Sequence, residues 1–128
     1  MKLLLDTCTF LWLAEGSGKL SKTASEAFLD AVTVRYLSVV SAWEIAIKYS
    51  IGRMPLPQKP DVYVPNLRQR GDIETLLLDE ASAVYVARLP WIHQDPFDRM
   101  LVAQAVVHDL TIATPDESIE QYGVKTLW

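Results

Sequence analysis

The sequence predicts an α/β protein, a three-layer α/β/α sandwich with a central parallel sheet. The first observation is that five short apolar runs of strand length alternate with seven longer segments of helical pattern. The second is that most of these runs are apolar at successive positions, which indicates strands buried on both faces. Strands that alternate with helices form parallel sheets whose two faces are covered. Both observations therefore favour one sheet between two layers of helices.

The predicted strands are short, and each is followed by a polar or turn-forming residue or by the chain end. They are residues 2–7 (KLLLDT), 34–40 (VRYLSVV), 74–79 (ETLLLD), 110–114 (LTIAT) and 124–128 (VKTLW). The segments between them have helical periodicity or helix-start signals. The predicted helices are residues 9–14, 22–32, 42–51, 60–70, 80–89, 96–108 and 115–121. The one Pro-rich connection, GRMPLPQKP at 52–60, is typical of a loop.

Length and composition predict a single domain that spans residues 1–128. Half of the residues are hydrophobic, which is enough to build a core in a chain of this size. Cys8 is the only cysteine, so no internal disulfide can form, and this suits a reducing cytoplasm. A zinc site is not expected, because Cys8, His93 and His108 are the only soft ligands and no paired spacing joins them.

Charge and hydropathy limit the function classes further. Twelve Lys and Arg against sixteen Asp and Glu give a net charge of −4, which argues against broad electrostatic binding of nucleic acid. Any nucleic-acid role must then be local and metal-assisted. No apolar run reaches the roughly 20 residues that a bilayer requires. Asp6 interrupts the apolar N-terminal stretch, so we do not expect a signal peptide. These features predict a soluble, cytoplasmic protein without a membrane partner.

Four acidic residues come from four separate segments, and three of them lie at the starts of predicted helices. Asp6 closes the first strand, and Glu44 follows the second strand by a few residues. Asp98 lies in the first turn of the sixth helix, and Asp116 follows the fourth strand. In an open α/β sheet, ligands bind beyond the carboxyl ends of the strands, where loops lead into helices. We therefore expect these carboxylates to lie near one edge of the sheet.

Most of these acids also have a structural explanation as parts of helix caps. Ser41 and Glu44 form an S-x-x-E capping box, in which Glu44 would bond back to the cap residue. Asp95 can cap the sixth helix with Pro96 in its first position. Asp98 would then be an anion favoured by the helix dipole. Acids are enriched in first helical turns, so either explanation is open for each residue taken alone.

Two observations favour a shared site over separate caps. At the last helix, Thr114 would be the cap residue and Glu117 would complete the box, which leaves Asp116 without a capping role. Asp98 shares its helical stripe with apolar residues three, four and seven positions later, and this stripe should face the sheet. An acid on that side is costly unless something pairs with it.

Converging carboxylates require a counter-charge. Two unit charges about 4 Å apart repel by roughly 4 kcal/mol at an effective dielectric of about 20. A divalent cation removes this repulsion, and an all-oxygen donor set favours Mg²⁺ or Mn²⁺ over Zn²⁺. Such ions support phosphoryl chemistry by polarising a phosphate oxygen and by lowering the pKa of a bound water. The acids Asp6, Glu44, Asp98 and Asp116 are therefore the predicted metal-binding and catalytic residues.

Four segments of the chain carry a family resemblance. They are LLLDT at 3–7, SAWEIAIK at 41–48, DPFDRMLVAQA at 95–105 and TPDESIEQYGV at 114–124. With these segments, the whole chain resembles the PIN-domain ribonucleases, specifically the VapC-type toxins of bacterial type II toxin-antitoxin pairs. The resemblance implies a PIN-like, five-stranded parallel sheet between helices.

The resemblance also implies an activity. By similarity, Asp6, Glu44, Asp98 and Asp116 are the acidic quartet that holds Mg²⁺ or Mn²⁺ for endonucleolytic cleavage of single-stranded RNA. The implied partners are an RNA substrate, a second copy in a homodimer, and a cognate antitoxin that wraps the toxin and blocks the site. Cys8 departs from many relatives, in which a His follows the DT pair. This difference concerns the surroundings of the site and leaves the acidic residues intact.

A few further residues are candidates for supporting roles. Thr7 and Thr114 flank two of the acids and are candidates to orient carboxylates, although Thr114 is equally explained as a helix cap. His93 precedes the Asp98 helix and is a candidate substrate contact or a structural residue. Arg99 is a candidate contact to phosphate. Lys48 lies four residues after an acid, which predicts an i,i+4 ion pair.

Two rival enzyme classes lack a required residue. A receiver-type domain needs a Lys at the end of a later strand, where this chain has TIATPD. A phosphatase of the haloacid dehalogenase type needs D-x-D after the first strand, whereas Asp6 is followed by Thr7 and Cys8. A catalytically inactive PIN-like or receiver-like regulatory or binding domain stays open as the alternative. Which RNA is cleaved also stays open, because recognition of single-stranded RNA depends on loop geometry.

Overall fold

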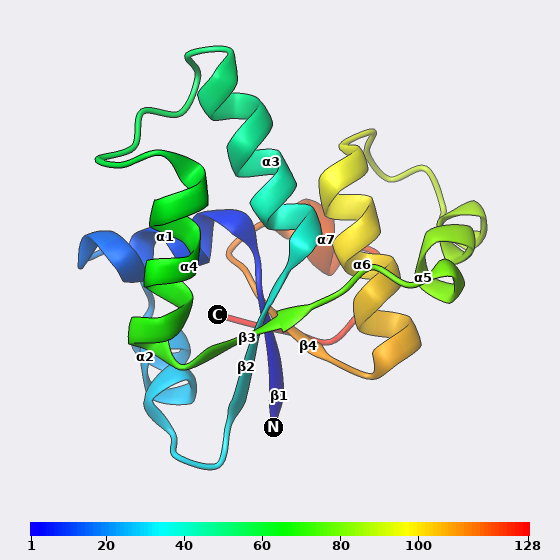
Figure 1. Cartoon of the computed structure of the whole chain (residues 1–128). Helices are drawn as coiled ribbons and strands as arrows, with labels where there is room; N and C mark the ends of the chain where they lie inside the picture. Colours follow the sequence, from blue (N-terminus) through cyan, green and yellow to red (C-terminus); the bar gives the residue numbers. More distant parts are fainter.

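The computed structural model describes residues 1–128 and contains a five-stranded sheet in which all neighbouring strands are parallel (Figure 1). The strands are β1 (Lys2–Leu5), β2 (Val34–Ser38), β3 (Ile73–Leu76), β4 (Thr111–Ala113) and β5 (Thr126–Leu127). Their spatial order is β3-β2-β1-β4-β5. The predicted three-layer α/β/α sandwich with a central parallel sheet is thereby confirmed.

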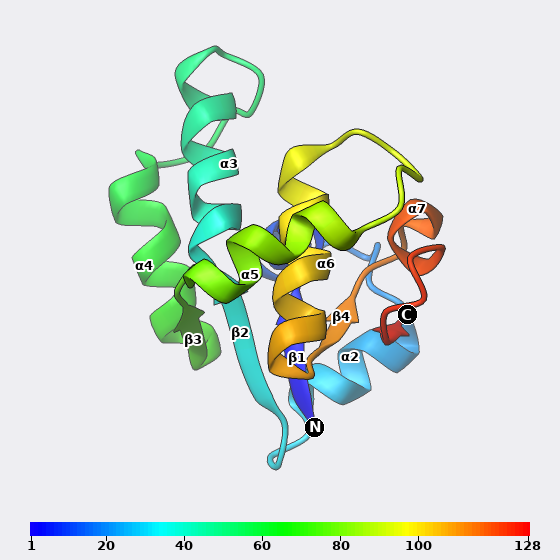
Figure 2. The same cartoon turned by 90° about the vertical axis from the view of Figure 1, so that its right-hand side faces the viewer.

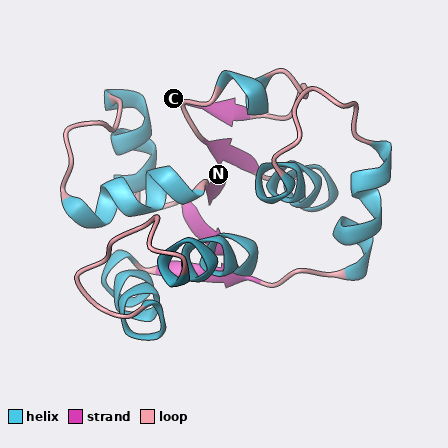
Figure 3. Ribbon diagram, turned by 90° about the horizontal axis from the view of Figure 1, so that it is seen from above, coloured by secondary structure: helices cyan, strands magenta, loops and turns pink.

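Seven α-helices connect and cover the strands. They are α1 (Thr7–Glu15), α2 (Lys22–Leu29), α3 (Val39–Ser50), α4 (Pro60–Gly71), α5 (Glu80–Tyr85), α6 (Pro96–His108) and α7 (Glu117–Glu120). A short 3₁₀ helix, Val86–Arg88, continues α5. Seen from above, the helices lie on both sides of the strands (Figure 3), and α5 crosses α6 (Figure 2). None of the helices combines the length and the apolar character that crossing a membrane requires.

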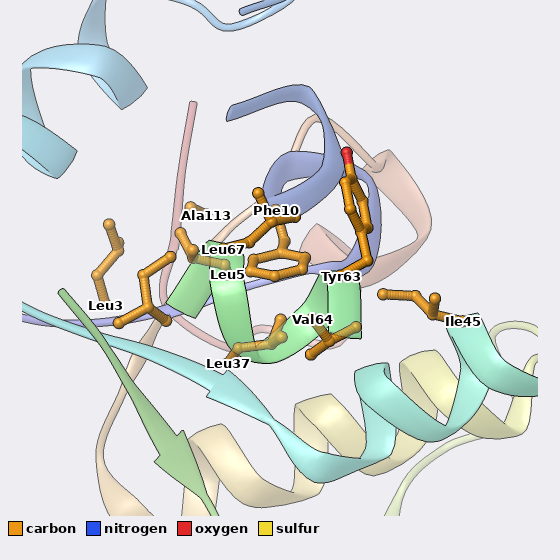
Figure 4. Close-up of a cluster of buried hydrophobic side chains, with 10 residues drawn as sticks. Leu3, Leu5, Phe10, Leu37, Ile45, Tyr63, Val64, Leu67 and Ala113 are labelled. Atoms are coloured by element: carbon orange, nitrogen blue, oxygen red, sulfur yellow. The ribbon is translucent and has the colours of Figure 1, made fainter. Parts of the chain in front are cut away.

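Two apolar clusters form the core, one on each face of the sheet. Alternation along β1 separates them, because successive strand residues point to opposite faces. Leu3 and Leu5 pack with Phe10 of α1 and Leu67 of α4 on one face (Figure 4). Leu4 packs on the other face with residues of α6 and α7. The strand is therefore buried on both sides, as its continuous apolar run predicts.

The predicted ends of several elements need correction. The first strand ends at Leu5, because Asp6 caps α1 and Thr7 is already helical. The second strand ends at Ser38, whose side chain accepts from the Val40 N–H and starts α3 three residues before the predicted position. The β-branched residues Val39 and Val40 look in sequence like a continuation of the strand. In the structure they lie in α3, because Ser38 caps that helix.

The sheet order defines a switch point at its centre. From β1 the chain proceeds through β2 to β3 on one side and then returns to β4 on the other side of β1. The register pairs Leu5 with Leu37 and with Ala113, so the chain leaves all three strands at the same level. Ligands of open α/β sheets bind at such a point, beyond the carboxyl ends of the strands. Asp6 is the residue that follows β1 there.

Candidate functional site

Asp6 lies at the carboxyl end of the central strand and is 6% exposed. Its Oδ1 accepts a 2.8 Å hydrogen bond from the Thr9 N–H, which makes it the N-cap of α1. Burial raises the pKa of the Asp6 carboxyl, hydrogen bonds from Thr114 and Thr9 oppose this increase, and the charge of Asp116 adds to it. Asp6 therefore combines a cap with a carboxylate that is buried next to another acid.

Glu44 is the second buried carboxylate, at 5% exposure. The predicted capping box with Ser41 is wrong, because Ser38 caps α3 and Glu44 lies in the second turn of that helix. Its Oε1 accepts a 2.6 Å hydrogen bond from the Thr7 hydroxyl at the start of α1. Lys48 pairs with Oε2 one turn later on α3, as the i,i+4 spacing predicts. Helix capping therefore does not explain this Glu.

Asp98 lies in the first turn of α6, as predicted. Asp95 caps this helix, and its Oδ1 accepts from the N–H groups of Phe97 and Asp98 at 2.9 and 3.1 Å. The Asp98 side chain is 21% exposed, and its Oδ2 lies 3.2 Å from Nε2 of His93. The sheet-facing stripe of α6 is buried at the apolar positions that follow Asp98. His93 is thus a direct neighbour of the candidate carboxylate.

The pKa of Asp98 is raised from 3.8 to about 6. Burial is the largest cause, followed by the charge of Asp95, and the charges of Asp116 and Glu44 add to it. The hydrogen bond with His93 acts in the opposite direction. Three other acids therefore destabilise the ionised form of Asp98. This is expected where acids converge on one region.

Asp116 caps α7, which corrects the prediction that Thr114 does so. Its Oδ1 accepts a 2.8 Å hydrogen bond from the Ser118 N–H, and α7 begins at Glu117. Thr114 Oγ1 accepts from the Asp116 N–H at 3.0 Å, and its hydroxyl proton is then free to bond Asp6. Thr114 is buried between the two acids and links them.

Charge effects connect the four acids in pairs. Asp116 acts on both Asp6 and Asp98, and Glu44 acts on Asp98. The Cys8 thiol reports the same grouping, because its pKa is raised to about 11 by desolvation and by the charges of Asp6, Glu44 and Asp98. As the side chains stand, no group of three or more His, Cys, Asp or Glu residues is arranged to hold a metal ion. The acids that could share a cation are therefore near one another but not closed around one point.

Arg99 has a different role from the one the sequence suggested. The residue is 3% exposed, and its Nη1 donates to the Pro90 carbonyl at 2.8 Å and to the Tyr122 hydroxyl at 3.0 Å. The Trp91 ring lies 3.9 Å from the guanidinium carbon. A buried guanidinium with these partners holds the chain that leads into α6, which corrects the expectation of a phosphate contact.

Tyr122 is the residue near the acids that sequence reasoning missed. Its hydroxyl lies 2.7 Å from Nδ1 of His93, and the two residues are 29 positions apart. No local sequence pattern, such as a capping box or a helical repeat, connects the two residues. Only the return of the chain after β4, which brings the segment following α7 beside the 89–95 loop, places them together.

Comparison with known proteins gives matches of three kinds. The chain matches the family model described as "PIN domain" over residues 3–125. It is 41% identical over 49 residues to Ribonuclease VapC16 of Mycobacterium tuberculosis, a match that covers 38% of this chain and 35% of that protein.

The other matches are structural. The fold is similar to a chain of VapBC2 from Rickettsia felis bound to a promoter DNA fragment, with a TM-score of 0.73, 12% identity, and coverage of 98% and 97% of the two chains. It is also similar to a chain of DNA-bound VapBC from Salmonella typhimurium, with a TM-score of 0.70, 19% identity, and coverage of 98% and 96%. At these identities the structural matches show a shared fold.

Proposed function

The chain belongs to the PIN domain family, and from that premise we propose that it is a Mg²⁺- or Mn²⁺-dependent endoribonuclease and the toxin of a toxin-antitoxin pair. The proposed substrate is single-stranded RNA, and the proposed reaction is hydrolysis of a phosphodiester by an activated water. The similarity to Ribonuclease VapC16 supports the nuclease class. The observation that supports the proposal is the position of Asp6 directly after the central strand β1, with Thr7 bonded to Glu44 and Thr114 bonded to the Asp116 N–H.

The donor set of these four acids fits a hard divalent cation. All donors are carboxylate oxygens, which suit Mg²⁺ and Mn²⁺ better than Zn²⁺. Mg²⁺ is commonly bound through one or two carboxylates, with water and substrate phosphate oxygens completing its coordination. When bound, the ion would polarise a phosphate oxygen and lower the pKa of a water.

The residues of this chain hold the carboxylates in place before any ion binds. The Thr9 and Ser118 N–H groups fix one oxygen each of Asp6 and Asp116. The Thr7 hydroxyl fixes one oxygen of Glu44. Such outer partners orient metal-binding carboxylates, and their loss typically reduces metal affinity or activity by about 10- to 100-fold. The acids are thus oriented before they meet a cation or a phosphodiester.

The proposed partners follow from the family. Two structural neighbours are chains of VapBC complexes, which supports a cognate antitoxin as a binding partner. We also propose a homodimer and a cytoplasmic location for this chain. Because the net charge is −4, binding of RNA must depend on local contacts at the acidic edge, where a cation would offset the repulsion between the acids and the phosphates.

An RNA cleavage assay with controlled metal content tests the proposal. Purified protein should cleave single-stranded RNA with Mg²⁺ or Mn²⁺ and should be inactive in excess chelator. Asp6→Asn and Asp98→Asn should abolish cleavage, because an amide is a poor substitute for a carboxylate as a metal ligand. Asp79→Asn is a matched control, since Asp79 caps α5 outside the acidic group. Full activity in chelator would refute the mechanism.

A further inference from the structure

The side chains of Arg99, Tyr122, His93 and Asp98 form a continuous hydrogen-bonded series. Arg99 Nη1 lies 3.0 Å from the Tyr122 hydroxyl, which lies 2.7 Å from His93 Nδ1, and His93 Nε2 lies 3.2 Å from Asp98 Oδ2. The series ends on one of the four candidate metal-binding acids. It begins at Arg99, a residue that is only 3% exposed, so its starting point is held within the protein.

The chemistry of the four groups sets the direction of the series. Arg99 can only donate, so the Tyr122 oxygen accepts from it. The single phenolic proton then has two neighbours, Nδ1 of His93 at 2.7 Å and the His93 carbonyl at 3.4 Å, and the shorter contact favours Nδ1. In a neutral imidazole, a nitrogen that accepts leaves the other nitrogen protonated. His93 Nε2–H therefore donates to Asp98 Oδ2.

We infer that Tyr122 is a positioning residue for the metal site, and that it acts through His93 on Asp98. The Tyr122 hydroxyl selects the His93 tautomer that donates to Oδ2, and this bond orients the Asp98 carboxylate that would help to hold the ion. The inference rests on the proposed function, because it concerns how Asp98 is presented to that ion. It assigns roles to three residues that the acidic quartet does not include.

The surroundings explain why the series keeps its geometry. The Arg99 guanidinium also donates to the Pro90 carbonyl at 2.8 Å, and the Trp91 ring covers it at 3.9 Å. The His93 N–H additionally approaches the Tyr122 hydroxyl at 3.4 Å, so backbone and ring of His93 are held by the same oxygen. Loss of that single oxygen should free the imidazole without emptying the space that the ring of Tyr122 fills.

The first test reads the tautomer of His93 in the metal-free protein. Nitrogen-15 NMR at about pH 8, above the ordinary histidine pKa of about 6.5, should show His93 protonated on Nε2. Tyr122→Phe should shift the ring toward a mixture of the two tautomers. A wild-type ring protonated on Nδ1 would overturn the inference. This measurement does not depend on metal binding or on RNA cleavage, so it can fail while the proposed function stands.

The second test measures Mn²⁺ affinity by the electron paramagnetic resonance signal of the free ion. Tyr122→Phe should raise the Kd by about 10-fold, in the range found for partners that orient metal ligands. His93→Ala should raise it at least as much, and adding Tyr122→Phe to His93→Ala should have no further effect. The matched control is Tyr49→Phe, which removes a hydroxyl near the far end of α3 and should leave the Kd unchanged.

The outcomes separate positioning from a merely structural role. If Tyr122→Phe lowers the thermal midpoint in chelator but binds Mn²⁺ as tightly as wild type, Tyr122 only stabilises the fold and the inference is wrong. If the two substitutions multiply their effects on the Kd, Tyr122 does not act through His93, and the inference is equally wrong. Wild-type protein that binds no Mn²⁺ would instead refute the proposed function, and the inference with it.

Discussion

The Thr7 hydroxyl donates a buried 2.6 Å hydrogen bond to Glu44 Oε1, and so joins the first turn of α1 to the second turn of α3. The two residues are 37 positions apart and follow neighbouring strands. A hydrogen bond to a buried carboxylate contributes about 1.5 to 3 kcal/mol and leaves a costly unpaired group when it is lost. The bond therefore fixes the orientation of the Glu44 side chain.

Thr7→Val should uncouple Glu44 from α1 while keeping the shape of the side chain. We expect Mn²⁺ affinity and RNA cleavage to fall by about 10-fold or more, because the carboxylate loses its orienting donor. Thr7→Ser keeps the hydroxyl and should retain most of both properties. Titration of Mn²⁺ and cleavage rates on the two variants decide this, and equal losses in Val and Ser variants would contradict the role of the hydroxyl.

Asp98 should make the metal-free protein less stable as pH rises. Its pKa is raised to about 6, chiefly by burial and then by the charge of Asp95, against 3.8 in the unfolded chain. The folded state thus binds more protons between these values, and stability that is fully present below the unfolded pKa is lost as pH rises through the folded one. At 1.36 kcal/mol per pKa unit, the loss is no more than about 3 kcal/mol.

Chemical denaturation in chelator between about pH 4 and pH 7 measures this effect, because protons bound only by the folded state appear as a slope. The free energy of unfolding of wild type should fall more steeply than that of Asp98→Asn. Saturating Mg²⁺ should flatten the wild-type curve, since metal binding competes with the proton. Parallel curves in chelator would show that Asp98 titrates normally.

Asp116→Asn should stabilise the metal-free protein. Its charge raises the pKa of both Asp6 and Asp98, and an Asn keeps the cap of α7 because Asn and Asp are equivalent N-caps. Relief of repulsion is expected to add about 1 to 3 kcal/mol to the free energy of unfolding in chelator. Added Mg²⁺ should then stabilise wild type more than the variant.

Asp79→Asn is the control with the opposite sign. Asp79 caps α5, and its pKa is lowered by hydrogen bonds to Ser82, with His108 nearby, so its charge is favourable where it stands. The Asn variant should be neutral or less stable, and Mg²⁺ should stabilise it as it does wild type. If Asp116→Asn behaves in the same way as Asp79→Asn, Asp116 is only a cap.

The proposed homodimer makes a surface prediction. Leu77 and Val84 lie in the segment that packs on α6, and they are 71% and 64% exposed. Symmetric dimers cover such apolar side chains. Val84→Glu should shift the protein toward monomer in sedimentation at micromolar concentration. A wild-type protein that is monomeric under these conditions would contradict the dimer.

Much of the fold is determined by local sequence. The continuous apolar runs predict buried parallel strands, and α6 has the predicted bounds because Asp95, Pro96 and the apolar stripe lie within a few turns of each other. Lys48 pairs with Glu44 because four residues is one helical turn. Similarly, the position of Asp6, Glu44 and Asp116 after strands predicts a common edge, since parallel strands present their carboxyl ends on the same side.

Tertiary structure alone decided which side chains orient the acids through hydrogen bonds. Thr7 reaches Glu44 because β1 and β2 are neighbours in register, and Tyr122 reaches His93 because the chain returns beside the 89–95 loop. Arg99 is conspicuous in the sequence as a free cation, yet packing buries it. Capping and periodicity act within one or two turns, so they are readable from sequence. Contacts between distant segments depend on sheet order and register, which arise only when the whole core is packed.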